Sequence, residues 1–145
     1  MSEPEITLDK TALSILLIED NPEDQFLVRR MLAQAPAVTY TVKVAHRRTE
    51  AMDALSQHFD ACLLDYQLGG FTALDLLAQI DSASLSGPII LLTGHDNFQV
   101  DQDALDLGVA DFIAKSEVRT SILDRTIRYA CRRFADQRQL SPLAH

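Results

Sequence analysis

The sequence predicts an α/β fold, a doubly wound five-stranded parallel sheet with helices on both faces. Two observations lead to this class. Five short apolar segments alternate with segments of helical periodicity along the chain. Most of these apolar segments are too hydrophobic to have a solvent-exposed face, as in parallel sheets that helices cover on both sides. Right-handed crossovers between successive strands then favour the doubly wound arrangement.

In the first half of the chain we expect three strand-helix units. SILLIE at 14–19 is typical of a buried strand, and after the Asn-Pro turn at 21–22 apolar residues recur on one helix face. YTVKVA at 40–45 alternates as a strand does, and a helical pattern follows it. ACLLDY at 61–66 is the third strand, followed by a helix around 72–80.

The second half supplies the remaining elements. GPIILLTG at 87–94 is bounded by Gly-Pro and Gly, which indicates a fully buried strand, and a helix around 98–107 follows. ADFIAK at 110–115 is a short fifth strand. From about 118 to 136 the spacing predicts the longest helix, with one apolar face.

Composition is consistent with one domain. The chain has 145 residues, of which 47% are hydrophobic and 23% charged, enough to build a sizeable core without the polar bias of a disordered protein. We expect an N-terminal extension at 1–12, one domain at 13–136 and a C-terminal tail at 137–145.

No targeting signal is recognisable. The first residues lack the basic start and apolar segment of a signal peptide, and no apolar run approaches the ~18 residues of a membrane span. We therefore expect a soluble, cytoplasmic protein without a membrane partner. Cys62 and Cys131 show no metal-binding spacing, so both are expected to be ordinary buried or half-buried thiols.

Charge is unevenly distributed along the chain, whose net charge is −8. Residues 1–117 contain 7 Lys and Arg against 19 Asp and Glu, whereas 118–145 contain 6 Arg against 2 Asp. The acidic body argues against nucleic-acid binding by this domain.

Polar side chains end four of the expected strands. The first strand ends in Glu19 and Asp20, the third in Asp65, the fourth in Thr93 and the fifth in Lys115. The carboxyl ends of parallel strands share one rim of the sheet, so these side chains should converge. Three neighbouring carboxylates raise one another's pKa unless a cation is present, and an all-oxygen cluster suits Mg²⁺.

Simpler explanations exist for single residues. Asp20 would cap the following helix, Thr93 would be a strand-end hydroxyl, and Lys115 would be a solvated surface charge. Their joint placement favours a functional site. In that site Asp65, on the middle strand, would be the nucleophile toward a phosphoryl group whose oxygens Thr93 and Lys115 bind.

Four motifs carry a resemblance to a known family. LLIEDNPED, CLLDYQLGG, PIILLTG and ADFIAK, within roughly 13–134, resemble the receiver domains of two-component response regulators in order and spacing. The resemblance implies a flavodoxin-like fold of the receiver type. It implies a phospho-accepting signalling domain that catalyses only its own phosphorylation and dephosphorylation, with the phosphoryl group coming from a histidine kinase or phosphotransfer protein.

The resemblance also implies roles for individual residues. Asp65 would accept the phosphoryl group, and Thr93 and Lys115 would respond to it together with the switch residue Phe112. The implied magnesium ligands are Asp20, Asp65, the backbone carbonyl of Gln67 and, through water, Glu19. Side chains two positions after Asp65 and Thr93, which are Gln67 and His95, would modulate the phosphoryl lifetime.

The sequence departs from the family pattern at two loops. Ser116 follows Lys115 where the family often has a cis proline, and a cis bond before a non-proline residue costs about 2.5–4 kcal/mol. We therefore expect a trans Lys115–Ser116 bond. Gly69 and Gly70 in LGGFTA should loosen the loop after Asp65.

Two other functions would use part of the same residue set. A phosphatase of the haloacid dehalogenase type also uses a strand-end Asp, Mg²⁺, Thr and Lys, but it has a second Asp two residues after the nucleophile, where this chain has Gln67. A degenerate receiver that acts only as a binding module is the second alternative. The complete set of acids, Thr93 and Lys115 argues against it.

The arginine-rich last helix has two interpretations. Leu123, Ile127, Ala130 and Phe134 form a heptad-like seam, which a last core helix would explain. Alternatively, the fourth helix, fifth strand and last helix form an output face for a two-fold homodimer. In such a dimer the arginines 119, 125, 128, 132, 133 and 138 would meet the aspartates 101, 103, 106 and 111 of the other copy.

Overall fold

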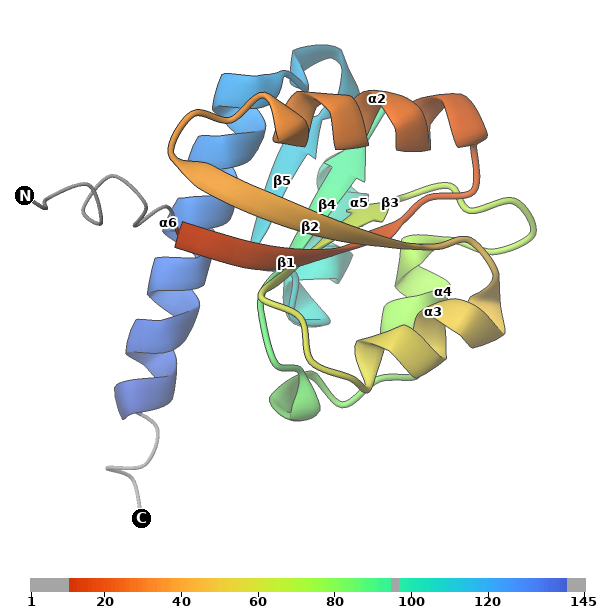
Figure 1. Ribbon diagram of the computed structural model, residues 1–145. Helices are drawn as coiled ribbons and strands as arrows, with labels where there is room; N and C mark the ends of the chain where they lie inside the picture. The colour runs from red at the N-terminus through yellow and green to blue at the C-terminus, as the bar shows by residue number, and fades with distance from the viewer. Residues whose placement is uncertain (1–10, 95–96, 141–145) are drawn as a thin grey trace, which may run out of the picture.

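A parallel sheet forms the centre of the protein. The structure, a computed structural model, describes residues 11–94 and 97–140, without the side chains of 139 and 140. Its described strands form one sheet in the order β2-β1-β3-β4-β5, and every pairing is parallel (Figure 1). The strands are β1 (Thr11–Ile18), β2 (Val38–Ala45), β3 (Ala61–Asp65), β4 (Ile89–Thr93) and β5 (Asp111–Ala114). The predicted fold class is confirmed.

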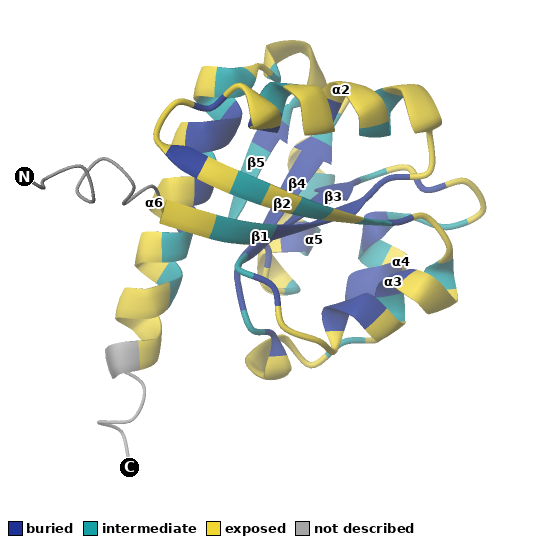
Figure 2. Cartoon of the chain, viewed as in Figure 1, coloured by how far each residue is buried: buried dark blue, intermediate teal, exposed yellow. Residues whose placement is uncertain are grey.

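Helices cover both faces of the sheet. They are α2 (Pro22–Ala33), α3 (Arg48–Leu55), α4 (Ala73–Leu77), α5 (Phe98–Asp106) and α6 (Thr120–Leu140), with short 3₁₀ turns η1 (Ser82–Ser84) and η2 (Lys115–Glu117). Successive residues of a strand point to opposite faces. Ile15 and Leu17 of β1 therefore pack with α2 and α6, whereas Leu16 and Ile18 pack with α3, α4 and α5. Figure 2 shows buried inner strands beneath exposed helix surfaces, with β2 and the start of β1 partly exposed at the edge of the sheet.

Two helix boundaries differ from the expected ones. α4 covers only 73–77 of the expected 72–80, because Thr72 and Asp75 form a capping box at its start and Ala78 already serves as its C-cap. α6 continues to Leu140, beyond the expected end near 136. Its last turns are held by Arg138, which stacks on the Phe134 ring at 4.9 Å and donates a hydrogen bond to the carbonyl of Leu85.

The heptad-like seam of α6 faces the sheet. Leu123, Ile127 and Ala130 are buried among the side chains of β1, β3, β4 and β5. Burying a leucine or isoleucine fully contributes about 1.5–3 kcal/mol relative to leaving it exposed. The explanation as a last core helix is therefore confirmed for these residues, which leaves them unable to form a dimer interface.

The two cysteines are buried or half-buried, as expected. Cys62 lies inside the sheet, and Cys131 of α6 donates its S–H to the carbonyl of Asp60 at 3.4 Å. Burial raises the pKa of both thiols, that of Cys131 to about 11. Within the described part of the chain, no helix has the length and apolar composition to cross a membrane.

Candidate functional site

Three carboxylates meet at the carboxyl ends of β1 and β3. Glu19 and Asp20 directly follow β1, and Asp65 is the last residue of β3, its neighbour in the sheet. One carboxylate oxygen from each lies within 4.8 Å of the others. The order of the sheet reverses between β1 and β3, and such a switch point is where doubly wound sheets place their sites. The expected convergence of these acids is therefore observed.

Two of the three acids are buried. Glu19 is 1% exposed and Asp65 is 3% exposed, whereas Asp20 faces solvent. Burial, and next the charge of Asp65, raise the pKa of Glu19 to about 7. Burial also raises the pKa of Asp65, against the opposing effect of Lys115. Neighbouring carboxylates with raised pKa values fit a divalent cation, which would stabilise their ionised forms.

Asp20 does not cap the following helix. The N-cap of α2 is Asn21, whose Oδ1 accepts hydrogen bonds from the backbone N–H groups of Glu23 at 2.8 Å and Asp24 at 3.3 Å. Pro22 occupies the first helical turn, where its missing N–H costs nothing. The simpler explanation of Asp20 as a cap is therefore wrong.

Lys115 points into the acidic cluster. Its Nζ lies 2.8 Å from Asp65 Oδ1 and 3.7 Å from Asp24 Oδ2, so it is not merely a solvated surface charge. It begins η2 directly after β5, and no cis bond occurs among the residues that the structure describes. The Lys115–Ser116 bond is therefore trans, as predicted.

A cavity of about 360 Å³ opens beside Asp65 and Lys115. Thr93, the last residue of β4, contributes to its wall, so the predicted hydroxyl lies in the same site. The other lining residues are Tyr66, Gln67, Gly94, Asn97 and Val100. The site thus combines an accessible space with carboxylates, a hydroxyl and an ammonium.

The remaining expected residues lie around this cavity or outside the described part. Gln67 is exposed and forms an isolated bridge with Thr72. Phe112 of β5 is half-buried and packs against the core on the side of α3, α4 and α5. His95 lies outside the described residues.

A side chain at Gly69 would crowd the Asp20 carboxylate. Its φ is +61°, and a Cβ added there would lie 2.7 Å from Asp20 Oδ2. The neighbouring Gly70 has φ +80°, but a Cβ added there would meet nothing within 4 Å. The two glycines had suggested a loosened loop, whereas Gly69 brings the backbone against a carboxylate of the site. Sequence reasoning missed this role, although a glycine four residues after Asp65 could have suggested close approach.

We expect Gly69→Ala to weaken Mg²⁺ binding at least about tenfold, because the new methyl group must displace the Asp20 carboxylate. Gly70→Ala is the matched control, since both changes impose a similar cost of order 1 kcal/mol for a positive φ. Titration calorimetry with Mg²⁺ measures the difference. Equal dissociation constants for the two variants would show that the contact with Asp20 is unimportant.

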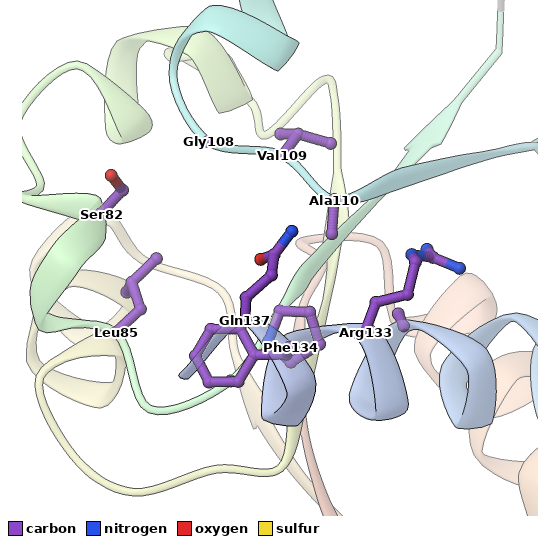
Figure 3. Close-up of a pocket in the computed structure, with 11 residues that line it drawn as sticks. Ser82, Leu85, Gly108, Val109, Ala110, Arg133, Phe134 and Gln137 are labelled. Carbon is purple, nitrogen blue, oxygen red and sulfur yellow. The ribbon is translucent and has the colours of Figure 1, made fainter. Parts of the chain in front are cut away.

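A second cavity, of about 380 Å³, lies at the other end of the sheet (Figure 3). Gly87 and Pro88 precede β4, and Gly108 and Ala110 precede β5, so the cavity opens at the amino ends of these strands. The end of α6 closes one side with Phe134, Arg133 and Gln137. The acids of the candidate site are absent from its lining.

Comparison with known proteins identifies the family. A family model for the response regulator receiver domain matches residues 15–127. The uncharacterised transcriptional regulatory protein YkoG of Bacillus subtilis (strain 168) is 30% identical over 119 residues. That match covers 81% of this chain and 50% of YkoG, so the chain spans about half the length of this relative.

Solved structures agree with this result. The phosphorylated cyanobacterial phytochrome response regulator RcpA is 28% identical with a TM-score of 0.66, over 81% of this chain and 89% of RcpA. The receiver domain of the sensor histidine kinase PA1611 from Pseudomonas aeruginosa PAO1 is 26% identical with a TM-score of 0.68, over 83% of this chain and 98% of that domain. Strand order, acidic cluster and family match agree, and the chain belongs to the response regulator receiver domain family.

Proposed function

We propose that Asp65 accepts a phosphoryl group from a histidine kinase or phosphotransfer protein. The observation that carries this proposal is the pairing of a buried strand-end carboxylate with an ammonium at 2.8 Å and two further acids within 4.8 Å. Glu19, Asp20, Asp65 and the backbone carbonyl of Gln67 would hold Mg²⁺. When bound, the ion would supply positive charge beside the transferring phosphoryl group.

The protein's own groups account for the rest of the transfer. An Asp65 oxygen would form the new bond to phosphorus while the bond from phosphorus to the donor's imidazole nitrogen breaks, leaving an acyl phosphate. Lys115 and Thr93 would each bind an oxygen of the transferred group. Thr93, at the end of β4, and Phe112, in the neighbouring strand β5, would then transmit the change to the surface.

Two relatives support the phosphorylation and the magnesium binding in this proposal. RcpA was solved in a phosphorylated form, and the PA1611 receiver domain holds a magnesium ion coordinated in its active-site cleft. The phosphatase alternative is not favoured, because the exposed Gln67 stands where that mechanism needs a titratable acid. A purely binding role is not favoured either, because the acids and Lys115 are assembled as the transfer requires.

Incubation with acetyl phosphate tests the proposal. With Mg²⁺ present, intact-mass spectrometry should show one added phosphoryl group per chain, and hydroxylamine should remove it because an acyl phosphate is labile to this nucleophile. Omitting Mg²⁺ or adding EDTA should prevent labelling. A label that forms equally well in EDTA would contradict the proposal.

Gln67 should affect how long the phosphoryl group persists. Its exposed side chain lines the cavity beside Asp65, where it can control the approach of water. We expect Gln67→Ala to change the dephosphorylation half-life about two- to tenfold, a change of order 1 kcal/mol in the barrier. We also expect His95→Ala to change it. The decay of the labelled species after donor removal gives the half-life, and values equal to wild type would exclude both residues from this role.

The signal would leave through α5, β5 and α6. The exposed arginines 125 and 132 of α6 and the exposed Asp106 of α5 are available for a two-fold homodimer. Arg128 already pairs with Asp124 of its own chain at 3.1 Å, and Arg133 with Asp111 at 3.4 Å. Light scattering with and without beryllofluoride, at low and high salt, tests this. A monomer that is unchanged in all four conditions would eliminate the dimer.

We further propose residues 13–136 as the functional unit, a cytoplasmic location and no nucleic-acid contact by this domain itself, although its relatives include transcriptional regulators.

A further inference from the structure

Lys115 has a second carboxylate neighbour. Its ammonium lies 2.8 Å from Asp65 Oδ1 and 3.7 Å from Asp24 Oδ2. An ammonium has three N–H donors, so two carboxylates can share it. Asp65 is buried, whereas the side chain of Asp24 is 42% exposed. Lys115 therefore bridges the interior of the site and its outer edge.

The space around Lys115 has two parts. Lys115 lines the cavity of about 360 Å³ that contains Asp65, and it also lines a smaller cavity of about 110 Å³ that contains Asp24. The smaller cavity is completed by Glu19, Leu27, Val28, Met31, Leu92 and Val118. The ammonium thus has room to move toward Asp24 without leaving the site.

Asp24 is held in place by its helix. It lies in the first turn of α2, where its backbone N–H donates to Asn21 Oδ1 at 3.3 Å. Glu23 lies in the same turn and donates to the same oxygen, but among the described contacts no ion pair joins it to Lys115. Glu23 and Asp24 therefore share the first turn of α2, but only Asp24 pairs with Lys115 among the described contacts.

We propose that Asp24 is a positioning residue for Lys115, holding the ammonium at the edge of the site while Mg²⁺ or the incoming phosphoryl group engages the Asp65 carboxylate. A lysine that pairs with Asp65 alone competes with the metal ion for that carboxylate. A second carboxylate weakens this competition and keeps the cation within reach. The role in phosphoryl transfer rests on the function proposed above.

A double-mutant cycle tests the inference. The Mg²⁺ dissociation constants of Asp24→Asn and Glu23→Gln are measured by titration calorimetry, each in the wild-type and in the Lys115→Ala background. Because exposed ion pairs are weak, the Mg²⁺ dissociation constant of Asp24→Asn should exceed that of Glu23→Gln by about two- to fivefold in the wild-type background. In the Lys115→Ala background this excess should vanish, so the two variants should have equal dissociation constants. Asp24→Glu, which keeps the carboxylate, should restore most of the affinity.

Other outcomes overturn the inference. An excess that persists without Lys115 would mean that Asp24 attracts Mg²⁺ directly through space, and no excess in either background would mean that its pairing with Lys115 has no effect. Labelling of the wild-type protein by acetyl phosphate separates this inference from the proposed function. A labelled protein without coupling contradicts the inference alone, whereas an unlabelled protein contradicts the proposed function whatever the cycle gives.

Discussion

Asp65→Asn should abolish phosphorylation by acetyl phosphate, because a neutral amide oxygen is a poor nucleophile toward phosphorus. The same change should raise the melting temperature of the metal-free protein. Burial raises the pKa of Asp65, so its ionised form opposes folding, and asparagine has the same shape without the charge. Intact-mass spectrometry and thermal unfolding measure the two effects.

Asp124→Asn is the matched control. Asp124 is also a buried aspartate, but it lies on α6, where it accepts hydrogen bonds from Tyr40 at 2.6 Å and from Arg128 at 3.1 Å. Its replacement should lower the melting temperature and leave phosphorylation intact. Stoichiometric, acid-stable labelling of Asp65→Asn would show that the nucleophile is elsewhere.

The second large effect concerns pH. Because burial and the charge of Asp65 raise the pKa of Glu19 from 4.5 to about 7, the folded protein binds this proton more tightly than the unfolded chain does. Without Mg²⁺, the free energy of unfolding should therefore decrease as the pH rises from about 4.5 to about 7. One pKa unit corresponds to about 1.4 kcal/mol, which limits the loss from Glu19 to about 3 kcal/mol.

Magnesium should offset this loss. It binds the ionised carboxylates, so at pH 7 or above a hundredfold excess over the dissociation constant should add about 2.7 kcal/mol to the free energy of unfolding. Urea unfolding across this pH range, with and without Mg²⁺, measures both effects. Glu19→Gln removes this titrating group and should reduce the slope of the metal-free curve, leaving the part that Asp65 contributes. An unchanged slope in that variant would assign the pH dependence to other groups.

The sequence could predict the general location of the site but not its detailed contacts. Glu19, Asp20 and Asp65 could be placed together because the carboxyl ends of neighbouring parallel strands share one rim, whatever the side-chain conformations are. The approach of Gly69 to Asp20 depends on the backbone path of a loop, and the contact between Lys115 and Asp24 depends on a helix position. Neither of these two contacts produces a periodic pattern of residues in the sequence.

Helix ends also depend on details that residue patterns alone do not decide. Asp20 and Asn21 are both good N-cap residues, so composition alone could not decide between them. The position of Pro22 as first residue of α2 places the cap on Asn21. The end of α6 depends on the distant carbonyl of Leu85, which a local pattern of apolar residues cannot include.

The state of the two native thiols makes the protein suitable for site-directed labelling. With a pKa of about 11, Cys131 is thiolate in only about one molecule in ten thousand at pH 7, and Cys62 is enclosed by the sheet. Maleimides react with the thiolate, so both native cysteines should remain nearly silent in a short reaction. A cysteine introduced at the exposed Ser121 on α6 would then carry a fluorophore or spin label as the sole fast-reacting site, and movements of that helix could be followed in a chain that keeps both native cysteines.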